Sequence, residues 1–230
     1  MNTAMNTAMH IVLRLAAIFT IAFVVSSIAM KLDEEKEAER RSADAEFIRG
    51  LREICEQQNG KACEELAFAY DIGRKSLERD DTRALEYALK ACDFGNAQGC
   101  VHGGNILSDD NPALQDFVKA LGIYERGCKL GNPVACGSLG TLYEDGLGTP
   151  RDFAVAGSYY EMACGAGEVK GCYYLGLLYH KNLLRDDAGR ARKLFRQSCM
   201  SGIRQACSVY EQSGNDAGNP DAGSGMSGSR

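Results

Sequence analysis

Residues 131–167 read GNPVACGSLGTLYEDGLGTPRDFAVAGSYYEMACGAG. Asn132 is a favourable helix N-cap, and Pro133 suits the first turn of the helix that follows it. Apolar residues then recur at helical spacing until GLGTP, residues 146–150, breaks the pattern. A second apolar stripe begins at Phe153 and runs to the glycines at the end of the stretch. The stretch therefore predicts a helical hairpin of about 36 residues.

The same helical-hairpin pattern recurs along the chain, and a pair of cysteines accompanies each recurrence. The ten cysteines form five pairs whose members lie eight positions apart, and the first members of successive pairs are 37, 36, 36 and 35 residues apart. An internal period of this size indicates a repeat architecture. An even number of regularly spaced cysteines is typical of a disulfide framework, and therefore of an oxidising compartment. The cysteines are Cys55, Cys63, Cys92, Cys100, Cys128, Cys136, Cys164, Cys172, Cys199 and Cys207.

Alignment on the second cysteine of each pair shows how the hairpins are expected to pack. The residue four positions later is always small, and the residues three and seven positions later are mostly Leu or Tyr. A glycine inside a helix costs up to about 1 kcal/mol relative to alanine, so its repeated use predicts a close approach of the facing helix. The small residues are Ala67, Gly104, Gly140 and Gly176. Residues 44–57 and 205–212 resemble half-repeats, which are expected to cover the terminal faces of a helical solenoid.

The two ends of the chain differ from the repeats. Residues 1–30 hold an apolar run, which we interpret as either a cleaved signal peptide or a membrane anchor over residues 11–30. A charged helical linker is expected at 31–43, the repeat solenoid at 44–213, and a disordered tail of small and polar residues at 214–230. Basic residues after the apolar run would favour a cytoplasmic C-terminal side, but the ten cysteines favour export.

Composition and motifs argue against several classes of function. The net charge is -5 without a clustered basic face, so nucleic-acid binding is not expected. Structural zinc sites use closer cysteine pairs or clustered histidines, and redox catalysis would need C-x-x-C. Neither pattern is present, and S-x-x-K, K-T-G and G-x-S-x-G are missing as well. The sequence therefore predicts no catalytic residue, metal or cofactor, and it places His102 and His180 at the surface.

Residues 135–152 follow the pattern A-C-x-x-L-G-x-x-Y-x-x-G-x-G-x-x-x-D, which resembles the Sel1-like repeat. The resemblance implies an all-α fold, a right-handed αα-solenoid of hairpins related to the tetratricopeptide repeat. The cysteine spacing is similar to that of the Helicobacter cysteine-rich protein branch. That branch implies a disulfide within each pair, from the end of one repeat's second helix to the start of the next repeat's first helix. Chain-entropy arithmetic then gives about 2.5 kcal/mol of stabilisation per bridge.

The expected function is that of an exported scaffold, periplasmic or extracellular or anchored by residues 11–30. It is expected to be a monomer that binds a protein or peptide and meets a membrane only through its N-terminal segment. The surface lined by the first helix of each hairpin is the candidate contact surface, because solenoids bind along extended curved surfaces. Its candidate contact residues are Phe68, Asn105, Thr141, Tyr173 and Leu177.

Two alternative functions follow from the resemblance alone. The cysteine-rich branch is associated with penicillin binding and weak β-lactamase activity. Cysteine-rich members of this repeat class also occur as assembly factors of the mitochondrial intermembrane space. The apolar segment near the N-terminus argues against the second alternative, because a mitochondrial presequence is Arg-rich and amphipathic.

Overall fold

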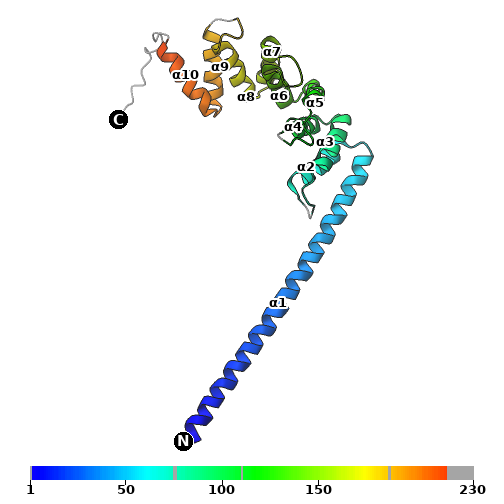
Figure 1. The fold of residues 1–230 in the computed structure, drawn as a ribbon, viewed down its shortest axis with the longest axis vertical. Helices are drawn as coiled ribbons and strands as arrows, with labels where there is room; N and C mark the ends of the chain where they lie inside the picture. Colours follow the sequence, from blue (N-terminus) through cyan, green and yellow to red (C-terminus); the bar gives the residue numbers. More distant parts are fainter. Residues whose placement is uncertain (1, 75–76, 110, 186–187, 217–230) are drawn as a thin grey trace, which may run out of the picture. The chain divides into compact units, whose positions relative to one another are not determined.

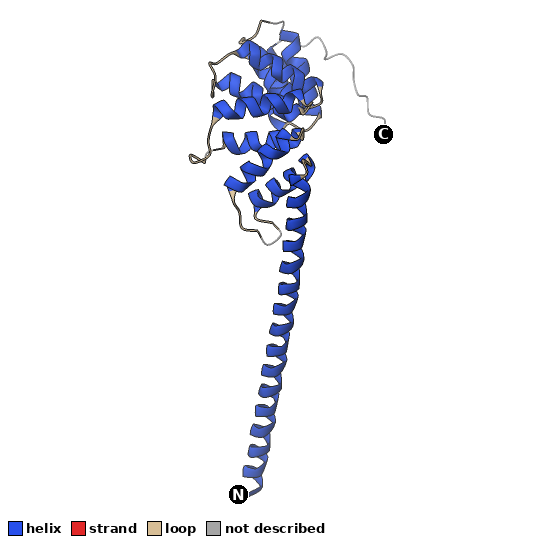
Figure 2. Cartoon of the chain, turned by 90° about the vertical axis from the view of Figure 1, so that its right-hand side faces the viewer, coloured by secondary structure: helices blue, strands red, loops and turns tan. Residues whose placement is uncertain are grey.

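The computed structural model describes residues 2–74, 77–109, 111–185 and 188–216, and every regular element in them is a helix (Figure 2). The chain divides into two compact units, Met1–Gly50 and Leu51–Arg230. Helix α1, Asn2–Glu56, makes up the first unit and contributes its last turns to the second. Across the described part of the chain, no helix combines the length and the apolar character needed to cross a membrane. The predicted tail, 214–230, lies outside the described residues from 217 onward.

The second unit is a row of helical hairpins closed by a single helix (Figure 1). Each helix packs against the next one in the chain, and the first helices of successive hairpins also contact one another. The prediction of an all-α solenoid is confirmed. Its helices are α2 (Gly60–Ile72) and α3 (Asp81–Asp93), α4 (Ala97–Ser108) and α5 (Phe117–Lys129), α6 (Pro133–Asp145) and α7 (Phe153–Gly165), α8 (Val169–His180) and α9 (Ala188–Met200), and α10 (Arg204–Asp216).

Capping side chains decide where most of these helices begin. The Asn132 side chain accepts hydrogen bonds from the backbone N–H groups of Val134 and Ala135, with Pro133 in the first turn as predicted. Short polar side chains satisfy N–H groups that have no partner inside a helix. The first helices α2, α4 and α8 are capped by Asn59, Asn96 and Glu168, and the second helices α3, α5 and α7 by Asp80, Asp116 and Asp152.

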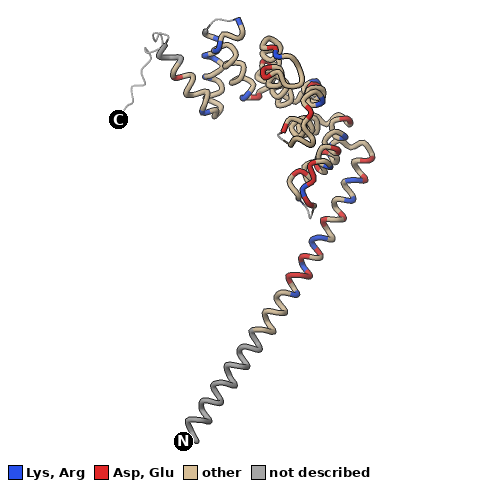
Figure 3. The backbone as a smooth tube through the Cα atoms, viewed as in Figure 1, with Lys and Arg blue, Asp and Glu red and all other residues tan. Residues whose placement is uncertain are grey.

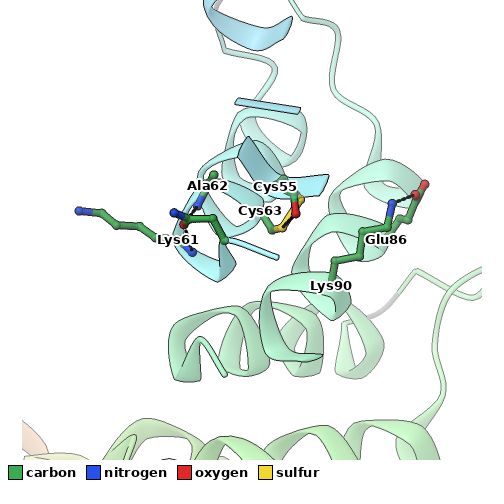
Figure 4. Close-up of a disulfide and its surroundings, with 7 residues drawn as sticks. Cys55, Lys61, Ala62, Cys63, Glu86 and Lys90 are labelled. Carbon is green, nitrogen blue, oxygen red and sulfur yellow. Dashed lines mark hydrogen bonds and ion pairs between the residues drawn. A yellow bond between two sulfur atoms is a disulfide. The ribbon is translucent and has the colours of Figure 1, made fainter. Parts of the chain in front are cut away.

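Five disulfides join successive helical segments, and no described cysteine is free. Cys128 lies in the last turn of α5 and Cys136 in the first turn of α6, with their Cα atoms 4.7 Å apart. Figure 4 shows the equivalent bond between Cys55 and Cys63, at the start of α2. The Cys55–Cys63 bond links the end of α1 to α2, and each of the other four links the end of one second helix to the beginning of the next first helix, so the predicted pairing is confirmed.

The turn inside each disulfide loop requires a left-handed backbone. The residue three positions after the first cysteine has a positive φ in every loop, and in four of the five it is glycine. Glycine adopts this conformation without steric cost because it has no Cβ. The exception is Gln58, with φ 65°. The glycines are Gly95, Gly131, Gly167 and Gly202.

Replacing Gln58 by glycine should therefore stabilise the protein. The left-handed conformation costs a residue with a side chain about 1–2 kcal/mol, and glycine removes this cost. Glycine also has more conformational freedom in the unfolded chain, which lowers the stability by about 0.5–1 kcal/mol. We expect the free energy of unfolding to rise by about 0.5–1 kcal/mol, measured by urea denaturation. Gln57→Gly is the control. Because φ of Gln57 is not positive, glycine relieves no strain there and only its entropic cost remains, so this variant should be less stable. Equal losses in both variants would contradict this account.

In the last three hairpins, the small residue of the first helix makes room for an aromatic ring from the second helix of the same hairpin. A Cβ at Gly104 would lie 2.4 Å from the Tyr124 ring, and one at Gly140 would lie 2.8 Å from the Tyr160 ring. In the last hairpin the corresponding contact of Gly176 is with the Phe195 ring, at 3.0 Å. The close helix approach predicted from these residues is confirmed, and its cause is the seating of an aromatic side chain.

Candidate binding surface

The candidate surface consists of the side chains five positions after the second cysteine of each pair, together with their neighbours on the same helices. We call it the first-helix face. Phe68 on α2 is 43% exposed, and Asn105 on α4 is also exposed. Thr141 on α6 and Leu177 on α8 are partly buried. Because successive first helices contact one another, these four equivalent positions follow one another along the row.

Tyrosine hydroxyl groups from the second helices hydrogen-bond to side chains of this face. Tyr124 donates a hydrogen bond to Asn105 Oδ1 at 2.8 Å. Tyr160 donates to Glu144 Oε2 at 2.8 Å, and its hydroxyl lies 3.2 Å from Thr141 Oγ1. At the two polar positions of the predicted contact set, Asn105 and Thr141, the side chain therefore lies within hydrogen-bonding distance of a tyrosine hydroxyl from the second helix.

The chemistry at these positions changes where the second helix lacks a tyrosine. In the last hairpin Phe195 replaces the tyrosine, and the residue on the face is the apolar Leu177. In the first hairpin Ala88 takes that place, and the residue on the face is Phe68. The middle of the face is therefore polar and its two ends are apolar.

Burial raises the pKa of both tyrosines that support the polar centre. For Tyr160, desolvation is the largest cause, and the neighbouring Glu144 carboxylate raises the pKa further. For Tyr124, desolvation likewise raises the pKa above that of an exposed tyrosine. Both hydroxyls therefore keep their protons at physiological pH and act as neutral hydrogen-bonding groups.

Contacts between hairpins fix two further side chains on the face. His102 on α4 places Nε2 3.4 Å from Asp71 Oδ2 on α2, and its side chain is only 11% exposed. The prediction that His102 is a surface residue was wrong, because its position in α4 faces the preceding hairpin. Tyr174 on α8 stacks on Tyr160 with 5.4 Å between ring centroids and remains 37% exposed.

The two candidate contact residues on α8 are less exposed than their neighbour Tyr174. Tyr173 and Leu177 are partly buried and pack against the cluster that contains Phe195 and Ala206. Tyr174 is the more exposed of the two neighbouring tyrosines. Among the described residues, no group of three or more His, Cys, Asp or Glu is placed to hold a metal ion.

The Sel1 repeat family model matches residues 60–96, 107–132, 133–168 and 169–203, which together make up more than half of the chain. The chain belongs to the Sel1 repeat family. Three matched segments, 60–96, 133–168 and 169–203, each span a first helix followed by its second, whereas 107–132 covers α5 and only the end of α4. Sel1 repeats form scaffolds that are typical of protein–protein interaction.

Solved structures show the same Sel1 fold. A Sel1 repeat protein from Oxalobacter formigenes is similar with a TM-score of 0.63 and 24% identity, covering 71% of this chain and 65% of that one. The protective antigen c5321 of uropathogenic Escherichia coli, which displays an SLR fold, gives 0.69 and 21% identity, covering 79% and 41%. Helicobacter pylori cysteine rich protein B is 27% identical with a TM-score of 0.47, covering 57% and 95%. This chain thus spans less than two thirds of the first two proteins, and no curated protein matches it significantly.

Proposed function

We propose that this Sel1 repeat protein is an exported scaffold that binds a protein or peptide ligand along its first-helix face. The observation that carries the proposal is the arrangement of that face. Exposed aromatic side chains, Phe68 and Tyr174, flank a centre of hydrogen-bonded polar groups on consecutive first helices.

Aromatic anchors and a polar centre are the combination that interfaces use. Aromatic residues carry much of the binding energy at protein interfaces, and surrounding polar groups orient the partner. Because Tyr124 and Tyr160 already satisfy part of the hydrogen-bonding capacity of Asn105 and Glu144, these side chains are held in place before a ligand arrives. A preorganised face loses less conformational entropy on binding.

Export is supported by the covalent chemistry of the solenoid. Five disulfides fit an oxidising compartment such as the periplasm or the extracellular space. In the proposal, residues 1–30 direct export, as a signal peptide or as an anchor over 11–30. The solenoid then operates as a monomer outside the cytoplasm.

A crosslinking pull-down from the native envelope, with the full-length oxidised protein as bait, tests the proposal. Phe68→Glu and Tyr174→Glu each place a charge on the first-helix face. We expect each to reduce capture of the dominant partner by about tenfold or more, equivalent to about 1.4 kcal/mol. Met162→Glu is the matched control, because Met162 is 52% exposed but lies on the second helix α7. Loss of capture in the control with retention in both face variants would refute the proposed surface.

A further inference from the structure

An ion pair beside a tyrosine links the last two hairpins. Arg190 on α9 forms a salt bridge with Glu161 on α7, and its guanidinium lies over the Tyr179 ring, 5.0 Å from the centroid. Glu161 stands three positions before the first cysteine of its pair, and Arg190 stands nine positions before the next first cysteine. Tyr179 stands seven positions after the second cysteine between them. These offsets define equivalent places in every hairpin.

At the first hairpin, the same three offsets hold Arg52 on α1, Arg83 on α3 and Tyr70 on α2. An arginine thus replaces the glutamate. Arg52 Nη2 donates a hydrogen bond to the Tyr70 hydroxyl, and Arg83 Nη1 donates to the same oxygen at 3.4 Å. Two guanidinium groups therefore converge on one phenol oxygen, and Arg52 stands where Glu161 of α7 supplies a carboxylate.

Of the two carboxylates near this pair, one is bound to Arg83 itself and the other to a lysine. Asp80 Oδ2 lies 3.3 Å from Arg83 Nε, and the same side chain caps α3. Glu86 Oε1 lies 2.7 Å from Lys90 Nζ, so that Glu86 is engaged along its own helix (Figure 4). Arg52 Nε is covered by protein atoms and has no hydrogen-bond partner among the described residues.

Arg52, Tyr70 and Arg83 line an open pocket, together with Glu86 and Tyr87. Acidic residues outnumber basic ones along α2 and α3, so the two arginines stand at an acidic stretch of the chain (Figure 3). Arg83 is already paired with Asp80, whereas Arg52 forms no salt bridge among the described residues. Arg52 is therefore the arginine whose charge an anion in the pocket would balance.

We infer that this pocket is a carboxylate subsite, which receives an acidic side chain of the protein ligand. The inference rests on the proposed binding function. A carboxylate is favoured because Glu161 supplies that group at the equivalent place, and because a guanidinium pairs with a carboxylate in a planar, two-pronged geometry. The Tyr70 oxygen accepts from both arginines, which leaves its own proton available for a carboxylate oxygen.

Titration of the full-length oxidised protein with N-acetylglutamate amide tests the subsite, with the Arg52 Nε–Hε resonance followed by NMR. We expect a saturable shift with this probe and none with N-acetylglutamine amide at equal concentration and ionic strength. A parallel titration with inorganic phosphate tests whether the pocket prefers a phosphate to a carboxylate. Saturation by phosphate at concentrations tenfold lower than the carboxylate requires, or no saturation by the carboxylate, would overturn the assignment.

Arg52→Glu separates loss of the subsite from loss of the fold. The variant restores the charges of the Glu161–Arg190 pair, now with Arg83, and fills the pocket from within. We expect a thermal midpoint equal to or above that of the natural protein at low salt, and no stabilisation by added N-acetylglutamate amide. Arg196→Glu is the matched control, because Arg196 has the same offset from its cysteine but is exposed on α9. If N-acetylglutamate amide raised the thermal midpoint of Arg52→Glu as much as that of the natural protein, the subsite would be refuted.

The same variant in the pull-down distinguishes failure of the subsite from failure of the proposed function. Saturable carboxylate binding without capture of any partner would leave the subsite standing and refute the scaffold function. Capture that is equal in the natural protein and in Arg52→Glu would leave the scaffold function standing and refute the role of the subsite in it.

Discussion

Reduction of the five disulfides should unfold the solenoid under conditions in which the oxidised protein is fully helical. Each bridge closes a short loop, and chain-entropy arithmetic assigns about 2.5 kcal/mol to each, hence about 12 kcal/mol for all five. That sum equals the whole stability of a typical domain. Thermal melting followed by circular dichroism, with and without a phosphine reductant, measures the effect.

Two controls make the result specific to the bridges. Protein treated with an alkylating agent without reduction should melt normally, because the described cysteines are all bonded. Removal of one central bridge, Cys128→Ala with Cys136→Ala, should cost about 2.5 kcal/mol. It should also broaden the transition, since each repeat contacts only its neighbours and the two halves become less coupled. A fully reduced protein, with ten thiols counted, that melts within a few degrees of the oxidised form would contradict the prediction.

Gly148→Ala should be among the most destabilising single substitutions in the chain. Gly148 has φ 70°, and an added Cβ would lie 2.5 Å from the carbonyl carbon of Phe117. The left-handed backbone costs alanine about 1–2 kcal/mol, and forcing the loop away from α5 costs about 1–3 kcal/mol more. We expect the free energy of unfolding to fall by about 3 kcal/mol, measured by urea denaturation.

Gly122→Ala is the control for this substitution. Gly122 lies within α5, and an added Cβ there would meet nothing within 4 Å. Alanine is preferred to glycine in a helix interior by about 1 kcal/mol, so this variant should be more stable. If both substitutions changed stability in the same direction, the close approach of the loop between α6 and α7 to α5 would not be the cause.

The sequence was most informative where one local rule repeats. Helix bounds followed from capping residues such as Asn132 and from turn glycines, and the spacing of the cysteines led to the correct pairing through the family it resembles. The small residues predicted close helix approach, although not which side chain would fill the space. The polar centre of the candidate surface was partly foreseen, because Asn105 and Thr141 occupy equivalent positions.

Features that depend on contacts between repeats were harder to predict. His102 looked like a surface residue until Asp71 of the preceding hairpin was placed beside it. The convergence of Arg52 and Arg83 on Tyr70 joins segments 13 and 18 positions apart in the chain, and neither spacing is a recognised signal. The comparison that reveals it, with Glu161 and Arg190, requires knowing which positions of neighbouring helices meet.

The bridges described above join residues only eight positions apart. In a chain that crosses a membrane N-terminus first, the two cysteines of each pair emerge almost together. Their disulfide can form before more distant segments of the chain have crossed. Oxidation and folding can then advance together from one end, one hairpin at a time, with little opportunity for scrambled pairs.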